Sequence, residues 1–276
     1  MRFLIRLCLL GVALFEVGCA NLKEVRDYAG KATQLTAYRE LTQRWAETYQ
    51  RERPYLFDND LLLARSENDG RKEAVKDLLK IHDTVSFYFA VMGKLAGDDT
   101  FSLKVNLDAL TRQIKVSELT GLEKKQVEAY GKLAGIVSST ILSGYQQQEI
   151  ARYIGHGNDP VQAMLAGMRQ VLKVYLGTLR NEEGRFGYLL LFKRETPQDR
   201  ILAALAGAEQ ARLVERADET RKKLIAVDLA IVKIAQGHQE LYNSRHDLGN
   251  RELMEQLESL VKELNSLNDL FDTVRG

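Results

Sequence analysis

The chain has 276 residues, with 39 lysine and arginine side chains, 38 aspartate and glutamate side chains, and two cysteines. A formal charge of +1 leaves no basic surface of the kind that nucleic acid requires, so no nucleic-acid partner is expected. Only three prolines occur, and few apolar runs alternate with polar residues. This composition favours long helices over sheet.

The first 18 residues have the composition of a secretory signal peptide. Arg2 and Arg6 supply the positive start, and residues 7–15 form an uncharged run of nine. That length falls within the range of a signal-peptide apolar region. It is too short to span a bilayer, which needs about 20 apolar residues.

The residues that follow, Val17 and Gly18, lead into Cys19. This stretch resembles the lipobox of bacterial lipoproteins, over about 20 of the 276 residues. The resemblance implies that residues 1–18 are removed and that Cys19 becomes the first residue, held on a membrane by a diacylglyceryl group. Glu16 departs from the pattern, which usually has leucine there. A carboxylate is costly to bury at the edge of an apolar run, so slower processing, or cleavage elsewhere, is expected.

The residues after Cys19 bear on the compartment. Ala20 and Asn21 lack the aspartate that retains lipoproteins in the inner membrane. The resemblance therefore implies an outer-membrane anchor with the chain facing the periplasm. Two alternatives stay open: ordinary signal peptidase could cut at the Gly18-Cys19-Ala20 pattern and release a soluble form, or the segment could remain uncleaved.

Removal of residues 1–18 takes away Arg2, Arg6 and Glu16, so the charge falls from +1 to 0 and 258 residues remain. Cys8 leaves with the signal peptide and lipid would block Cys19, so no disulfide is expected. Stability must then come from packing.

The N-terminal part, residues 19–54, predicts one lipid-tethered helix roughly 45 Å long. Apolar and aromatic residues recur there every three or four positions until Pro54. The members of this stripe are Val25, Tyr28, Ala32, Leu35, Tyr38, Leu41, Trp45 and Tyr49. The spacing favours a buried core edge, and residues 55–276 are expected to form a separate helical bundle domain.

Turn and cap residues divide the bundle. We expect a short helix over 55–68, a turn at Asn68-Asp69-Gly70, and a helix over 71–96 whose apolar residues step by three and four. Asp98-Asp99-Thr100 can cap a shorter helix that stops near 121. A long helix is then predicted over 122–155.

Further along, 155–160 (Gly-His-Gly-Asn-Asp-Pro) predicts the clearest break, followed by a central helix from Val161. Another long helix is expected after Pro197, and a terminal helix carries leucines from Leu253 to Leu267. The fold prediction is all-α, an elongated bundle of about six to seven mostly antiparallel helices, some of them long.

One apolar stretch, 184–194, does not fit a simple bundle and is our candidate partner contact. A helix tail, a short strand or an inserted loop are all compatible with it, and burial against the bundle competes with an exposed contact. Its apolar members are Phe186, Tyr188, Leu189, Leu190, Leu191 and Phe192. The C-terminal leucine seam could pack within the chain, which the short connection favours, or against a second copy.

No motif for catalysis, phosphate binding or metal binding occurs in the sequence. His82 and His238 lie on apolar seams, where hydrogen-bonded core histidines are expected. His238 and His246 would lie about 12 Å apart on one helix, too far to share a metal. We expect no enzyme activity, no cofactor and no metal.

The preferred function is a membrane-tethered scaffold or adaptor for another envelope protein. A second hypothesis is a periplasmic protein that holds a small apolar ligand or lipid between helices, using Tyr175 and Tyr188. A third is an enzyme with His82 or His238 beside a carboxylate in the core.

Overall fold

The computed structural model describes residues 22–97, 110, 113–115, 118–144, 147–195 and 200–273. These residues form helices and no strand, which confirms the all-α prediction. The helices are α2 (Lys23–Ala32), α3 (Thr36–Ala46), α4 (Thr48–Glu52), α5 (Asp58–Leu95), α7 (Lys124–Ser143), α8 (Ile150–Glu195), α9 (Arg200–Asn243) and α10 (Arg251–Thr273), with 3-10 turns η1 (Arg53–Tyr55), η2 (Glu118–Thr120) and η3 (Gln147–Glu149). The predicted cap at Asp98-Asp99-Thr100 and the helix that it begins lie outside the described residues, apart from Leu110 and Ile114 near the end of that helix.

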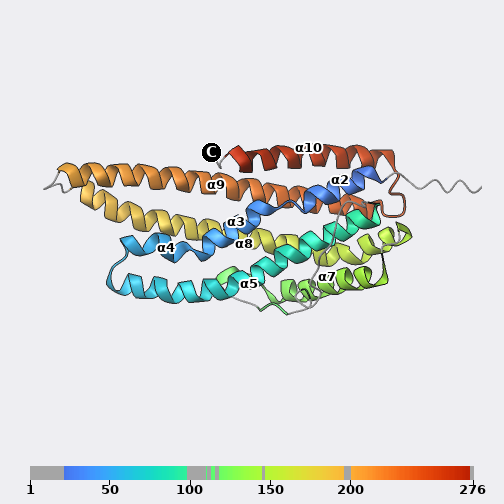
Figure 1. The fold of residues 1–276 in the computed structure, drawn as a ribbon, viewed down its shortest axis with the longest axis horizontal. Coiled ribbons are helices and arrows are strands. Elements are labelled where there is room, and N and C mark those ends of the chain that lie inside the picture. The colour runs from blue at the N-terminus through green and yellow to red at the C-terminus, as the bar shows by residue number, and fades with distance from the viewer. Residues whose placement is uncertain are drawn as a thin grey trace, which may run out of the picture.

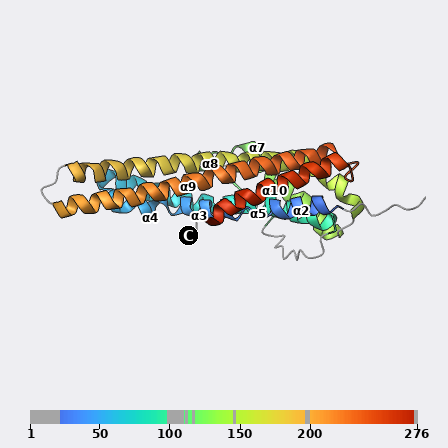
Figure 2. The ribbon, with the colours of Figure 1, turned by 90° about the horizontal axis from the view of Figure 1, so that it is seen from above.

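The hairpin of α8 and α9 organises the molecule. These helices have 46 and 44 residues, which corresponds to about 69 and 66 Å. They run antiparallel and side by side in both views (Figures 1 and 2). The other helices line this hairpin: α7 packs against α8, α10 packs against α9 and α2, and α5 contacts α2, α3, α7 and α8.

A single large apolar core joins these helices. The aromatic residues of the N-terminal segment belong to it, since Tyr28, Tyr38 and Trp45 are buried together with residues of α5, α8, α9 and α10. The predicted burial of this stripe is confirmed from Val25 to Trp45, while Tyr49 at its end is only half-buried. The predicted central helix is also confirmed, because Val161, Met164 and their neighbours along α8 are buried.

The prediction of one helix across residues 19–54 is wrong, because the described part of that range forms α2, α3 and α4, followed by the start of η1. At the first break the Thr33 hydroxyl donates to the Gly30 carbonyl oxygen at 2.6 Å. The Leu35 carbonyl oxygen lies 3.1 Å from His82 Nε2 and accepts its hydrogen bond. These side chains satisfy backbone groups that a continuous helix would have satisfied internally.

Two predicted breaks lie inside helices. The turn at 68–70 is part of α5, where a Cβ at Gly70 would lie 2.5 Å from Leu119 Cδ1. The break at 155–160 is part of α8, where a Cβ at Gly157 would lie 2.2 Å from the Tyr88 hydroxyl. These glycines allow close approach of a neighbouring side chain instead of ending a helix, and Pro160 is accommodated within α8.

The predicted helix over 122–155 is also wrong at its end. It stops at Ser143, before Gly144 with φ +79°, and α8 begins at Ile150. A capping box between Glu123 and Gln126 fixes its start. The irregular segment at 184–194 is helical, since α8 continues to Glu195.

The C-terminal leucine seam is buried within the chain. Leu253, Leu257, Leu260 and Leu264 lie in the core or at its edge, where α10 packs against α9 and α2. Asn250 caps this helix, because its side-chain oxygen accepts the backbone N–H of Glu252 at 2.9 Å. Intramolecular packing is therefore confirmed, and a second copy could reach the seam only if α10 left its own core.

Candidate functional site

The hairpin of α8 and α9 projects beyond α4 and the start of α5 at the end where the chain passes from α8 to α9 (Figures 1 and 2). We call the end of this hairpin, residues 187–190 and 200–207, the hairpin tip. α2, the helix nearest in sequence to Cys19, lies toward the opposite end of the molecule (Figure 1). Cys19 itself lies outside the described residues.

The structure divides the predicted contact residues between two environments. Phe186 and Leu190, four residues apart, pack with Ala206 of α9 in a small apolar cluster of their own. Tyr188 points away from this cluster and is 80% exposed, while Leu189 is half-buried. The side chains of Leu191 and Phe192 are outside the described part of the chain.

The tip of α9 adds apolar surface that the sequence pattern had not singled out. Leu205 is 63% exposed, and Ile201 and Leu202 also expose much of their side chains. The buried seam of α9 runs from Leu241 toward the tip in steps of three and four residues, through Ala217 to Ala206. Leu205 lies beside this seam and stays largely exposed, whereas Leu241 lies on the seam and is fully buried.

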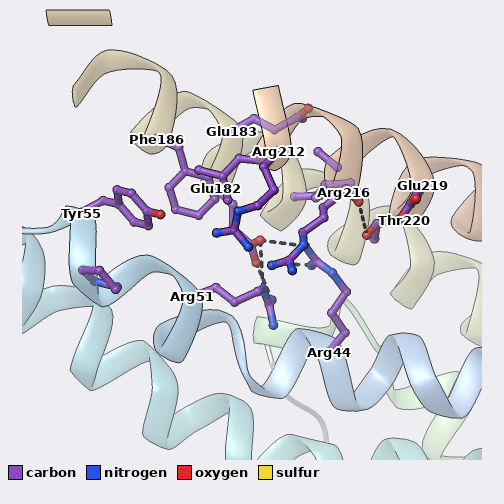
Figure 3. Close-up of a pocket in the computed structure, with 14 residues that line it drawn as sticks. Arg44, Arg51, Tyr55, Glu182, Glu183, Phe186, Arg212, Arg216, Glu219 and Thr220 are labelled. Atoms are coloured by element: carbon purple, nitrogen blue, oxygen red, sulfur yellow. Dashed lines mark hydrogen bonds and ion pairs between the residues drawn. The ribbon is translucent and has the colours of Figure 1, made fainter. Parts of the chain in front are cut away.

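Below the tip, four arginines from three helices surround a cleft of about 410 Å³. We call it the arginine cleft: Arg44 lies on α3, Arg51 on α4, and Arg212 and Arg216 lie on α9. Their side chains converge from both sides of the cleft toward Glu182 of α8 (Figure 3). Pro54, Tyr55, Phe186 and Leu213 contribute apolar surface to the walls.

Glu182 is the most buried charged group of the cleft, with 1% of its side chain exposed. Arg44 Nη2 donates to Glu182 Oε2 at 3.0 Å, and Arg51 Nη2 donates to Oε1 at 2.7 Å. Burial alone would raise the pKa of Glu182, but the hydrogen bonds and charges of Arg51 and Arg44 outweigh it and lower the pKa. Burial lowers the pKa of Arg44, but a guanidinium loses its proton only far above neutral pH, so Arg44 remains a cation.

At the wall of the cleft, the Tyr55 hydroxyl donates to Glu209 Oε1 at 2.6 Å, and Arg212 Nε donates to Glu209 Oε2 at 2.7 Å. Hydrogen bonds from Arg212 and Tyr55 lower the pKa of Glu209 to about 2. Burial and the bond to Glu209 raise the pKa of Tyr55 to about 12. Arg216, by contrast, forms no side-chain hydrogen bond or ion pair with any described residue, although its charge also helps to lower the pKa of Glu209.

The two seam histidines are core residues, as predicted. His238 Nδ1 lies 3.1 Å from Asn158 Oδ1, which can only accept, so Nδ1 carries the proton. The Tyr88 hydroxyl then donates to Nε2 at 2.7 Å. Burial lowers the pKa of His238 to about 3, so the imidazole is neutral. Neither hydrogen-bond partner is a carboxylate, which the enzyme hypothesis had required for this residue.

His82 is nearly buried and does lie beside a carboxylate, with its Nδ1 3.2 Å from Asp83 Oδ1. Asp83 is also bound by Arg39, and His82 Nε2 donates to a backbone oxygen. Both ring nitrogens therefore have protein partners. Within the described ranges, no group of three or more His, Cys, Asp or Glu side chains is arranged to hold a metal ion.

The two aromatic residues of the ligand-binding hypothesis are not brought together. The Tyr175 ring is buried and stacks on Trp45, and its hydroxyl donates to Thr42 at 3.0 Å. Tyr188 is exposed at the hairpin tip. Among the helices that the structure describes, none is long and apolar enough to cross a membrane.

Sequence reasoning missed the arginine cleft, although one signal for it was present. Glu182 falls on the apolar seam of α8 that includes Tyr175, Leu179 and Phe186, with steps of four, three and four. A charged residue at a core position requires a partner of opposite charge. The sequence could not identify Arg44 and Arg51, which lie more than 130 positions earlier.

Comparison with known proteins yields no relative: no family model, curated protein or solved structure matches this chain.

Proposed function

We propose that this protein is a lipid-anchored, non-enzymatic scaffold or adaptor of the bacterial cell envelope, which holds another protein at the hairpin tip. In this proposal a diacylglyceryl group on Cys19 binds the outer membrane from the periplasmic side. The observation that carries the proposal is the exposed apolar surface of Tyr188 and Leu205 at the end opposite α2.

The arrangement of the two ends supports an adaptor. Cys19 precedes the start of α2 by four residues, a distance of at most about 14 Å along the chain. The hairpin from that end to the tip is about 66 Å long, judged from the length of α9. A tether at one end would therefore hold the apolar tip well away from the membrane that carries the lipid.

The chemistry of the tip favours a protein partner with a helical contact surface. The exposed residues Ile201, Leu202 and Leu205 of α9 lie three and four positions apart, beside the seam that packs against other helices of this chain. A partner helix with an apolar stripe can cover such a face with the same spacing. Full burial of one leucine side chain contributes about 1.5–3 kcal/mol, so a few contacts suffice for a transient complex.

The buried histidines support a non-enzymatic function. His238 is fully buried and both ring nitrogens are hydrogen-bonded to Tyr88 and Asn158. A substrate would reach these nitrogens only if the core opened. The exposed side chains of Tyr188 and Leu205 at the tip offer apolar surface, which suits binding better than catalysis.

Site-specific photocrosslinking in intact cells tests the contact. A crosslinking residue at position 205 is expected to capture one envelope protein, and the double variant Tyr188→Ser/Leu205→Ser is expected to lose it in co-purification. Leu229→Ser is the matched control, because Leu229 is also an exposed leucine of α9 but lies away from the tip. Equal recovery with both variants, or a crosslink to lipid of the opposing membrane, would contradict the proposal.

The tether has its own test. Cys19→Ser is expected to lose incorporation of a labelled fatty acid and to leave the membrane fraction. Retention of that variant in the membrane fraction would contradict the lipid anchor without affecting the tip contact.

A further inference from the structure

We infer that the arginine cleft is a binding site for an amphipathic oxyanion, a molecule with one carboxylate or phosphate-ester head on an apolar chain or ring. This inference does not depend on the lipid anchor or on the tip contact. It rests on the charge, the unused hydrogen-bond donors and the apolar walls of the cleft.

The charged groups of the cleft are unequally matched. Its lining residues include four guanidinium groups, from Arg44, Arg51, Arg212 and Arg216, and three carboxylates. Of those carboxylates, Glu183 is bound on both oxygens by Arg221, which is outside the lining. Glu182 alone neutralises both Arg44 and Arg51.

The remaining carboxylate, Glu219, is exposed at one side of the cleft (Figure 3). Arg212 is engaged by Glu209, which does not line the cleft. Positive charge therefore exceeds negative charge where the arginine side chains meet.

Hydrogen-bond donors are also left over at this point. The side chain of Arg216 makes no bond with any described residue, and its guanidinium carries five N–H donors. Arg44 binds Glu182 through Nη1 and Nη2, and Arg51 uses Nε and Nη2. Arg44 Nε and Arg51 Nη1 make no bond to a described residue. A planar or tetrahedral oxyanion accepts several such donors at once.

The two arginines on Glu182 are held in position before a ligand enters. Arg51 Nη2 also lies 3.1 Å from Thr48 Oγ1, and Thr48 Oγ1 donates to Glu182 Oε1 at 3.0 Å. These bonds restrict the rotation of side chains that would otherwise lose conformational entropy on binding. The buried carboxylate therefore organises the cationic floor of the cleft.

The walls explain why the ligand has an apolar part. The Tyr55 and Phe186 rings meet with centroids 4.7 Å apart, and the hydrogen bond to Glu209 fixes the orientation of Tyr55. Pro54, Leu179, Leu213 and Ala217 complete the apolar lining. A cleft of about 410 Å³ with this mixture of walls exceeds the needs of a free inorganic ion and matches a small organic anion.

Photolabelling of the full-length protein in phosphatidylcholine nanodiscs tests the site. The probe is decanoic acid with a photoreactive diazirine on its chain, and empty nanodiscs give the background. We expect label on peptides that contain Tyr55, Phe186 or Leu213. Decanoate and decyl phosphate should compete about tenfold better than uncharged decanol, and inorganic phosphate alone should compete poorly.

The variant Arg216→Gln should reduce labelling about tenfold, because one charge-assisted interaction of the headgroup is lost. Arg251→Gln, at an exposed arginine of α10 remote from the cleft, should leave labelling unchanged. Competition by decanoate but not decyl phosphate identifies a carboxylate ligand, and the reverse identifies a phosphate ester.

Either of those outcomes supports the inference. Equal competition by decanol, label spread over unrelated peptides, or full labelling of Arg216→Gln would overturn it. The competition series uses the unaltered protein, so the result stands even if a variant misfolds. Loss of the tip contact in Tyr188→Ser/Leu205→Ser would leave this labelling intact, which separates the two proposals.

Discussion

The two ends of α9 have similar apolar sequences and opposite environments. Leu241 lies on the buried seam of α9 near α2 and α10, whereas Leu205, beside the continuation of that seam at the hairpin tip, is 63% exposed. The neighbours differ, because α10 packs against α9 and Tyr28 of α2 contacts Gly237 at one end, while the hairpin projects past α4 and α5 at the other (Figure 1). A leucine of α9 is therefore buried or exposed according to its place on the helix and the elements that reach it.

Truncation of the two leucines should give the largest contrast. Leu241→Ala is expected to lower the free energy of unfolding by about 2–5 kcal/mol, because it removes core contacts and leaves a cavity. Leu205→Ala, at an exposed position, should change it by less than about 0.5 kcal/mol. Urea unfolding followed by circular dichroism measures both. Similar losses would mean that the tip face is covered within the chain.

Two glycines of α9 give a second contrast. A Cβ at Gly237 would lie 2.4 Å from Tyr28 Cε2, so Gly237→Ala should destabilise the protein by about 1–3 kcal/mol. A Cβ at Gly207 meets nothing within 4 Å, and Gly207→Ala should stabilise by about 0.5–1 kcal/mol through the higher helix propensity of alanine. Thermal unfolding of the two variants side by side measures the difference. The changes in stability of the two variants should have opposite signs, and changes of the same sign would contradict the close packing at Gly237.

Acidification should lower the free energy of unfolding through His238, which is buried at the end of α9 near α2 and α10. Its pKa is about 3 in the folded chain and near 6.5 when unfolded, so the unfolded state binds the proton first. The stability of the fold with a neutral His238 is fully present above pH 6.5 and is lost as the pH falls toward 3. Between pH 7.5 and 5.5 the free energy of unfolding falls by about 1.4 kcal/mol. The His238→Gln variant should be less stable than the unaltered protein at pH 7.5, yet its free energy of unfolding should fall less on acidification. An equal fall in both proteins would rule out His238 as the source of the acid sensitivity.

The arginine cleft lies between the two ends of α9, at a place where a charged residue occupies a position on the apolar seam of α8. Tyr175 and Leu179 of α8 are buried apolar residues, and the next seam position is Glu182. Arg44 and Arg51 neutralise it from α3 and α4. Removal of one partner from a buried ion pair lowers stability by more than the intact pair adds to it. This cluster therefore constrains how α3, α4 and α8 pack against one another.

Glycine and proline gave the least reliable predictions. Gly157 and Pro160 indicated a break, yet both lie inside α8, since Gly157 makes room for the Tyr88 ring that reaches His238. Gly70 lies inside α5 for a similar reason, against Leu119. A close approach to a residue far away in the sequence cannot be distinguished from a turn by composition alone. Two breaks that were not predicted, at 33–35 and 144–149, had weaker local signals.

The sequence by itself determined the helical class, the burial of the aromatic stripe around Tyr28 and Tyr38, and the packing of the C-terminal leucines. Each of these depends on a period of three or four residues that any helix imposes. Tertiary structure alone decided that Leu205 is open while Leu241 is buried, and that Arg44 and Arg51 meet Glu182. Those outcomes depend on which helices lie beside each other. A local sequence pattern does not identify a neighbour that is more than 100 positions away.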